Sequence, residues 1–369
     1  MLRCIAWSLG ILALSLALTA PISLCAQTAP REGIEERAIG VHALTGATII
    51  VSPTETIALG TIIIRDGVIT HVGERVAIPR DARVHDLTGH TITAGWIDLD
   101  LRLEPTLPSS DASREGRAWN DRVHPELDIA SGLRLEESVA KSHRTSGFAI
   151  ALASPNKGIL AGQSALIRLT GRDDRRTTIE ERMLQVAALE HGGWGAGGYP
   201  GSRMGAIALL RQTLFDAQWY QEAWDQHTVA PDSIPRPEVN RALAALEPIL
   251  SGEQRLAVRS RDALDLLSLG EIIEEFGLKH VIAFGSGEEQ LWLDAIADLG
   301  VPIVLPVNYP KTPIVDGPGG DTNVPLRALE MWARAPENAI RVHESKIPFA
   351  FTPRGLSKVS DFADRIRAT

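Results

Sequence analysis

The chain has 369 residues, of which 44% are hydrophobic, and its formal net charge is -9. This length accommodates one large core, such as a barrel of about 250 residues, and the acidic balance excludes the basic surface on which nucleic-acid binding depends. Both cysteines, Cys4 and Cys25, lie in or next to the N-terminal leader. The rest of the chain therefore has neither a disulfide nor a thiol nucleophile.

Residues 1–26 have the pattern of a secretory signal peptide. Arg3 provides a basic start, an apolar run follows as far as Ala20, and small residues come next. The cleavage site stays open, and a membrane anchor is the alternative interpretation of the same run. We expect export to the periplasm or beyond it, with no membrane contact after cleavage, and a flexible lead-in over residues 27–37.

Residues 38–90 predict a small β-sandwich segment, because short apolar runs alternate there with turn residues. The clearest signal is the pair Asp66-Gly67 between two β-branched runs in residues 62–72. This pair is typical of a two-residue hairpin turn with positive φ angles. We therefore expect a tight hairpin at this point.

The stretch TITAGWIDLDLRL, residues 91–103, alternates like a strand that enters a core. It carries opposite charges at Asp100 and Arg102, and side chains two residues apart on a strand point to the same face. A buried charge must be paired or take part in chemistry. We expect an ion pair between these two side chains.

From residue 91 onward, short apolar runs alternate with helical stretches, which predicts an α/β fold with a parallel sheet wrapped by helices. The predicted barrel strands are Trp96–Leu101, Phe148–Ala153, Ser164–Leu169, Leu256–Arg259, Val281–Phe284, Pro302–Leu305 and Pro348–Phe351. The predicted helices are Arg203–Gln226, Arg236–Leu250, Ala263–Phe276 and Gly287–Leu299. Residues 252–285 have the order of a complete βαβ unit.

Around this first strand the sequence resembles the entry segment of the amidohydrolase superfamily, G-x-x-x-x-P-G-x-I-D-x-H-x-H. Gly89, Gly95, Ile97 and Asp98 fit that segment, and Ala94 stands where the proline is usual. The later segments SGFAIALASPNKGILAGQSALIRLTG, RMGAIALLRQTLFDAQWYQEAW and EEFGLKHVIAFGSGEEQLWL are similar to its imidazolonepropionase-like branch, in an exported bacterial subgroup.

The resemblance implies a small β-sandwich followed by a (β/α)8 TIM-like barrel over residues 91–369. It also implies hydrolysis of non-peptide C–N bonds in small cyclic amides, with zinc as the typical metal. Because the sequence reaches a helix, SKVSDFADRIRAT, just after its last predicted strand, we expect a barrel truncated at that point and a sandwich that is incomplete at the C-terminus.

The metal ligands that the resemblance implies are substituted in this sequence. The two histidines after the first strand correspond to Asp100 and Arg102, the histidine of the fifth strand to Arg259, and that of the sixth to Phe284 or a neighbour. No aspartate stands at residues 352–354, where the last ligand belongs. Arginine offers no lone pair and keeps its proton, so we expect a dismantled metal site and no metal cofactor in this chain.

Other patterns give weaker signals. Gly193, Gly195 and Gly198 have dinucleotide-binding spacing, but the residues before them read as helix rather than strand, so a loop is favoured. His143 is expected to end a helix, where its charge suits the helix dipole. His124 and Glu126 are expected to serve as capping or surface residues.

Three functions follow as hypotheses. The chain is the non-catalytic half or scaffold of a larger enzyme, with a catalytic amidohydrolase domain or a second copy as its partner. Alternatively, it is an active exported hydrolase with an altered site around Asp98 and Asp100. The third possibility is an anion-binding barrel, in which Arg102 and Arg259 hold a small carboxylate or phosphate ligand.

Overall fold

The computed structural model describes residues 40–105, 116–170, 177–189, 198–315 and 324–369, so the predicted signal peptide and lead-in lie outside it. The chain divides into two compact units between Ala94 and Gly95, whereas the sequence places the boundary after residue 90. None of the helices within the described ranges has the length and apolar character needed to cross a membrane.

The described part of the first unit is a single five-stranded sheet, which confirms the predicted β-rich N-terminal part. Its strands are β1 (Val41–Ser52), β2 (Glu55–Arg65), β3 (Val68–Gly73), β4 (Arg83–Asp86) and β5 (Thr91–Ile92). The order is β3-β2-β1-β4, with β5 also paired to β1. The predicted hairpin joins β2 to β3, and its turn residues Asp66 and Gly67 have φ angles of 51° and 82°.

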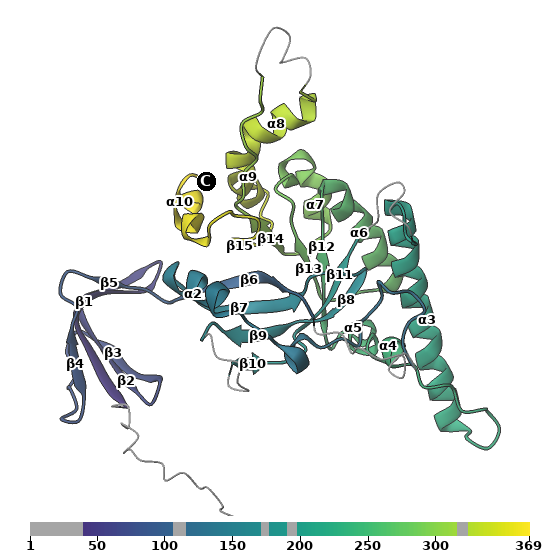
Figure 1. Cartoon of the computed structure of the whole chain (residues 1–369), viewed down its shortest axis with the longest axis horizontal. Coiled ribbons are helices and arrows are strands. Elements are labelled where there is room, and N and C mark those ends of the chain that lie inside the picture. The colour runs from purple at the N-terminus through teal and green to yellow at the C-terminus, as the bar shows by residue number, and fades with distance from the viewer. Residues whose placement is uncertain (1–39, 106–115, 171–176, 190–197, 316–323) are drawn as a thin grey trace, which may run out of the picture. The chain divides into compact units, whose positions relative to one another are not determined.

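The described strands of the second unit form two sheets (Figure 1). The first has the order β10-β9-β7-β6, with β6 (Trp96–Leu103), β7 (Phe148–Pro155), β9 (Ala165–Arg168) and β10 (Thr178–Glu180). The second has the order β15-β14-β13-β12-β11-β8, with β8 (Leu160–Gln163), β11 (Leu184–Ala188), β12 (Arg255–Arg259), β13 (Val281–Phe284), β14 (Ile303–Pro306) and β15 (Phe349–Thr352). Strands β6 and β7 are parallel, as are β11 to β15.

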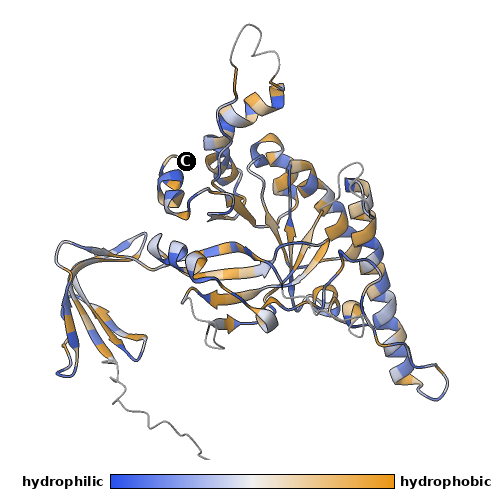
Figure 2. Ribbon diagram, in the orientation of Figure 1, coloured by the Kyte–Doolittle hydropathy of each residue, from blue (hydrophilic) through white to orange (hydrophobic). Residues whose placement is uncertain are grey.

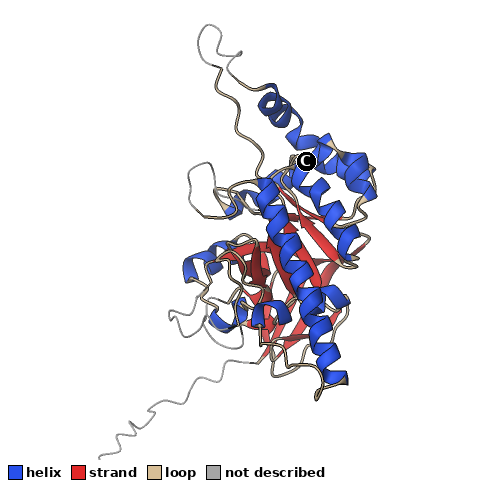
Figure 3. Cartoon of the chain, turned by 90° about the vertical axis from the view of Figure 1, so that its right-hand side faces the viewer, coloured by secondary structure: helices blue, strands red, loops and turns tan. Residues whose placement is uncertain are grey.

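Helices cover the strands of this unit, as Figure 3 shows for the long helix that lies across them. They are α2 (Glu137–Thr145), α3 (Arg203–Val229), α4 (Arg241–Ala244), α5 (Glu247–Ser251), α6 (Ala263–Phe276), α7 (Leu293–Asp298), α8 (Leu326–Arg334), α9 (Asn338–Glu344) and α10 (Phe362–Arg367). Orange and blue residues mix along α3 in Figure 2, as expected of a helix with one face on a core and one toward solvent.

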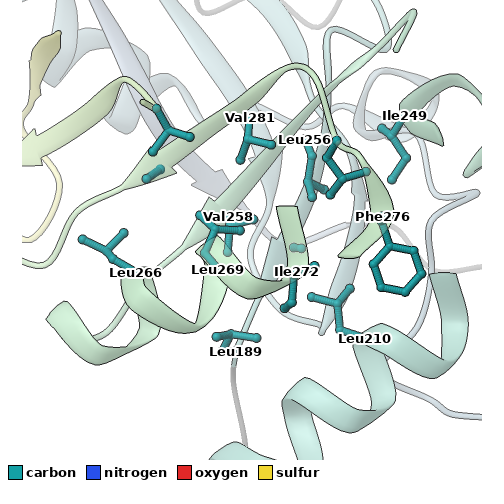
Figure 4. Close-up of a cluster of buried hydrophobic side chains, with 14 of the residues drawn as sticks. Leu189, Leu210, Ile249, Leu256, Val258, Leu266, Leu269, Ile272, Phe276 and Val281 are labelled. Atoms are coloured by element: carbon teal, nitrogen blue, oxygen red, sulfur yellow. The ribbon is translucent and has the colours of Figure 1, made fainter. Parts of the chain in front are cut away.

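The predicted βαβ unit is confirmed as β12, α6 and β13. Helix α6 has the predicted bounds because Asp262 caps its first turn, accepting a hydrogen bond from Asp265 N, and because Gly277 ends it with a φ of 59°. Its apolar face, with Leu266, Leu269 and Ile272, packs against buried residues of β12 and α3 (Figure 4). This core holds β12 in place and therefore fixes the position of its last residue, Arg259.

Several predicted elements are wrong in type or length. The stretch TTIEERMLQVAALEH, read as helical, contains the strands β10 and β11. The strand predicted over residues 164–169 is β9, but it pairs antiparallel with β7 and with β10, so it is not a parallel barrel strand. The helix predicted over residues 236–250 divides into α4 and α5, because Asn240 caps the first and Pro248 starts the second. Residues 287–299 keep only the short helix α7 after a 3-10 turn.

Candidate functional site

A cluster of charged side chains lies at the carboxyl ends of the parallel strands, which is where α/β barrels place their sites. Asp100 and Arg102 come from β6 and form the expected ion pair. Arg102 Nε donates to both carboxylate oxygens of Asp100 at 3.0 and 3.1 Å, and Nη2 donates to Oδ2 at 2.8 Å. Asp100 is 3% exposed. The pair is therefore bidentate and largely withdrawn from water.

Arg259, the last residue of β12, approaches the same carboxylate from the opposite sheet. Its Nε is 3.7 Å from Asp100 Oδ1, and the residue is 3% exposed. Its other nitrogens donate to the Pro155 carbonyl at 2.7 Å and to Ser154 Oγ at 2.6 Å. Because Ser154 stands opposite Arg102 in the β6–β7 register, Arg259 ties the ends of β6, β7 and β12 together.

A second buried cluster surrounds Asp98, two residues earlier on β6. Its Oδ1 accepts hydrogen bonds from Asp100 N and from Thr352 Oγ1, both at 3.0 Å. Its Oδ2 lies 3.2 Å from His143 Nε2. Thr352 ends β15 and His143 stands in the last turn of α2. Asp98 thus joins the first strand of the unit to its last strand and its first helix.

The hydrogen-bond geometry assigns a charged state to His143. Its Nδ1 lies 2.9 Å from the Val139 carbonyl, which can only accept, and its Nε2 faces the Asp98 carboxylate. Burial alone lowers the pKa of His143, but the hydrogen bonds to Asp98 and to Val139 outweigh burial and hold that pKa above its ordinary value. His143 is therefore an imidazolium paired with a buried carboxylate.

The side chains at the expected ligand positions do not fit a divalent metal. Arg102 and Arg259 carry cationic groups without lone pairs, and a unit positive charge about 4 Å from a divalent ion costs on the order of 8 kcal/mol at an effective dielectric near 20. Arg102 also occupies both carboxylate oxygens of Asp100. Over the described ranges, no three His, Cys, Asp or Glu side chains are grouped so as to share a metal ion.

Two further ligand positions hold side chains with other contacts. Phe284, at the end of β13, is 4% exposed and belongs to an apolar cluster with Leu152, Val186 and Val304. In residues 352–354, where the aspartate was expected, the hydroxyl of Thr352 donates to Asp98. An aromatic ring and an already committed hydroxyl leave no donor for a metal at either place.

The remaining candidates lie outside this cluster. His124 Nε2 lies 2.7 Å from the Asp121 carbonyl, and Glu126 pairs with Arg117 at 3.5 Å. The expected capping or surface role does not describe Glu126, whose side chain is only 16% exposed. Gly193 and Gly195 lie outside the described residues. The residues before these glycines were predicted to be helical, and this prediction is wrong, because the strand β11 precedes the glycines and α3 follows them.

The sequence did not predict the contacts of Asp98 with His143 and Thr352, or that of Ser154 with Arg259. His143 was expected at a helix end, and it does lie in the last turn of α2, but its ring faces inward. A signal existed in the helix pattern: Val139 and His143 are four residues apart on one face, so His143 lies on the packed side of α2. The contact with Thr352 spans 254 residues and left no local signal.

Comparisons with known proteins agree with this fold. No protein-family model matches the chain. A dihydroorotase from Anaeromyxobacter dehalogenans (strain 2CP-C) is 49% identical over 43 residues, which are 12% of this chain and only 10% of that protein. The crystal structure of an amidohydrolase from Thermotoga maritima MSB8 matches with a TM-score of 0.67 and 16% identity, over 88% of this chain and 83% of that chain. At this identity the likeness shows the fold, and the predicted amidohydrolase-type α/β barrel fold with its β-rich N-terminal part is confirmed.

Proposed function

We propose that this chain is an exported member of the amidohydrolase superfamily, of the imidazolonepropionase-like branch, in which an ion-pair network replaces the metal centre. In this role it is the non-catalytic half or scaffold of a larger enzyme that hydrolyses C–N bonds of small cyclic amides. The fold likeness to an amidohydrolase and the short, close match to a dihydroorotase support the superfamily. The side chains at the strand ends support the loss of catalysis.

The observation that carries the proposal is the position of Asp100 between two guanidinium groups. A carboxylate bound bidentately by Arg102 and approached by Arg259 is already neutralised. Binding a metal there would require breaking this ion pair and leaving a buried guanidinium beside a dication, which is strongly unfavourable. Asp98 is equally occupied, because three donors use its oxygens. Neither carboxylate is left to activate water.

The test compares the wild-type chain with Asp100→Ala in two measurements, elemental analysis for divalent metals and turnover of a panel of small cyclic amides. We expect the same metal content in both proteins and no turnover above buffer in either, because no metal is held at Asp100. A metal present at one per chain in the wild type and lost in Asp100→Ala would overturn the proposal. Turnover that depends on Asp100 would do the same.

An anion-binding role is the second candidate, and one observation favours it. The side chain of Arg102 keeps 18% of its surface exposed, while its partner carboxylate is buried. A planar guanidinium on a partly exposed side chain suits a carboxylate or phosphate. If the role is real, phosphate or small dicarboxylates raise the melting temperature of the wild type but not that of Arg102→Gln. An equal rise in both proteins would remove this candidate.

A further inference from the structure

Two histidines of the first unit meet on one face of its sheet, far in sequence from the charged cluster. Nδ1 of His42, on β1, lies 3.1 Å from Nε2 of His85, on β4. The two ring centroids are 5.3 Å apart and the planes are inclined by 33°. Both residues are half-buried, so solvent reaches the pair while neighbouring side chains restrict the rings.

The sheet itself fixes this arrangement. Strands β1 and β4 pair in parallel, with Leu44 opposite His85 and Arg83 opposite His42. Residues opposite each other or two apart on a strand share a face, so both imidazoles project to the same side. Thr45 Oγ1 donates to the His85 carbonyl at 3.2 Å. The histidines are therefore held by rigid strands, which is the support that a ligand site needs.

We propose that His42 and His85 form a binding site for a divalent transition-metal ion of the zinc, copper or nickel class. Imidazole nitrogens bind zinc at about 2.0–2.1 Å, so two of them on one tetrahedral ion lie roughly 3.3 Å apart. The observed separation of 3.1 Å differs from this by a few tenths of an ångström. Loss of the shared proton and a small ring rotation turn the facing nitrogens into two ligands of one ion.

The rest of the coordination shell comes from outside the pair. Among the residues that the structure describes, no third His, Cys, Asp or Glu joins the two histidines in a metal-sized group. Water or a small molecule fills the open positions, as in metal sites that exchange ligands. Arg83 shares the face with His42 and is exposed. Its charge opposes a cation there, though water screens much of the effect.

The experiment titrates the metal-free full chain with Zn²⁺ by calorimetry and records Cu²⁺ electron paramagnetic resonance spectra. We expect one Zn²⁺ per chain, bound roughly tenfold or more weakly in His42→Gln and in His85→Gln, because each variant removes one of two ligands. The copper spectrum shows two coupled nitrogens in the wild type and one in each variant. Binding weakens on acidification, since only neutral imidazoles bind metals. Arg83→Ala binds more tightly than the wild type.

His71→Gln is the matched control. This histidine lies on the neighbouring strand β3 and is exposed, and its register opposite Ile63 places it away from the pair. Equal binding by the wild type and the variants at residues 42 and 85 would overturn the proposal, leaving a plain hydrogen bond between two imidazoles. An equal loss in His71→Gln would also overturn it. Asp100→Ala leaves the pair of histidines unchanged, so this test does not depend on the role of the charged cluster around Asp100.

Discussion

Asp98 holds three donors within 3.2 Å, and it does so at 2% exposure. A carboxylate so far from water is tolerable only when it is paired and hydrogen-bonded. The imidazolium of His143 provides the pair, and the hydroxyl of Thr352 and the amide of Asp100 provide the remaining hydrogen bonds. Removing the imidazolium of His143 leaves an uncompensated buried carboxylate, which lowers the stability of the second unit.

The first prediction concerns His143→Gln, which removes the buried cation. We expect a loss of about 3–5 kcal/mol in the free energy of unfolding, as found when one partner of a buried pair is removed. Urea denaturation followed by circular dichroism measures it. His124→Gln is the matched control, because the ring of His124 hydrogen-bonds to a backbone carbonyl, that of Asp121, and not to a buried carboxylate. A change below about 1 kcal/mol in His143→Gln would show that the pair contributes little.

The second prediction concerns how the difference in unfolding free energy between the wild type and His143→Gln depends on pH. The folded state raises the pKa of His143 above its unfolded value, so the stabilisation is complete below about pH 6.5 and is lost as the pH rises through the raised pKa. The difference in unfolding free energy between wild type and His143→Gln is therefore larger near pH 6 than near pH 9. A difference that grows with pH would contradict a charged His143.

Local patterns predicted the site only in part. The pairing of Asp100 with Arg102 followed from a spacing of two residues on one strand. The resemblance placed Arg259 at a ligand position, in the same pocket as Arg102, but its contact with Asp100 was not predicted. The roles of Thr352 and Ser154 were not accessible, since each depends on how distant strand ends meet. A single Ser or Thr at the end of a short apolar strand leaves no sequence pattern that predicts which side chain its hydroxyl will bind.

The predicted helices and strands were right where capping residues marked their ends and the apolar spacing was regular. Helix α6 was predicted with its true bounds because Asp262 and Gly277 mark both ends and the apolar spacing between them is regular. Strand β11 was missed because LQVAA is apolar except for Gln185 and follows charged residues, a pattern that a buried helix shares with a buried strand. Pairing with β12 and β8 decides its type, and pairing partners are not visible in one segment.

The third prediction compares two leucines of α6. Leu269 is fully buried between β12 and α3, whereas Leu264 is 38% exposed. Leu269→Ala is expected to cost about 2–5 kcal/mol through lost burial and the cavity left behind, and Leu264→Ala less than about 1 kcal/mol. Urea denaturation of both variants tests this. Equal losses would mean that α6 does not pack as Figure 4 shows.

The fourth prediction concerns the hairpin between β2 and β3. Gly67 has a φ of 82° and open space where a Cβ would lie, so Gly67→Ala is destabilised by backbone strain alone, by about 1–2 kcal/mol. Gly73 in the same sheet lacks a positive φ, and a Cβ there meets only Val76 Cγ2, at 3.4 Å. Gly73→Ala should therefore be nearly neutral. Thermal unfolding of the two variants separates strain from side-chain contact.

At the scale of the whole molecule, the chain divides into two units, each of which has at least one apolar cluster of its own. The three larger apolar clusters of the described residues belong to the second unit, and the smallest, with Val41, Ala43 and Ile63, belongs to the first. A unit with its own core can fold by itself. The ion-pair cluster lies entirely within the second unit, while the two paired histidines lie within the first.

The fifth prediction follows from this division. Residues 95–369 produced alone are expected to unfold cooperatively and to keep the stability difference between wild type and His143→Gln, because the hydrogen bonds of Asp98 to Asp100, His143 and Thr352 lie within them. Circular dichroism and urea denaturation of this fragment make the comparison. A fragment that is unfolded, or one in which the difference disappears, would show that the first unit is needed to hold the second together.

The hydrogen bond from Thr352 to Asp98 has a consequence for biosynthesis. As the ribosome delivers the chain, Asp98 and His143 emerge early, but the hydroxyl that completes their environment arrives about 250 residues later. At typical elongation rates of about 5–20 residues per second, that interval lasts on the order of tens of seconds. Throughout it the nascent second unit carries an under-satisfied acid in its first strand. The hydrogen-bond network around Asp98 is therefore completed only after β15 has been synthesised, and chaperones have access to the incomplete unit throughout that interval.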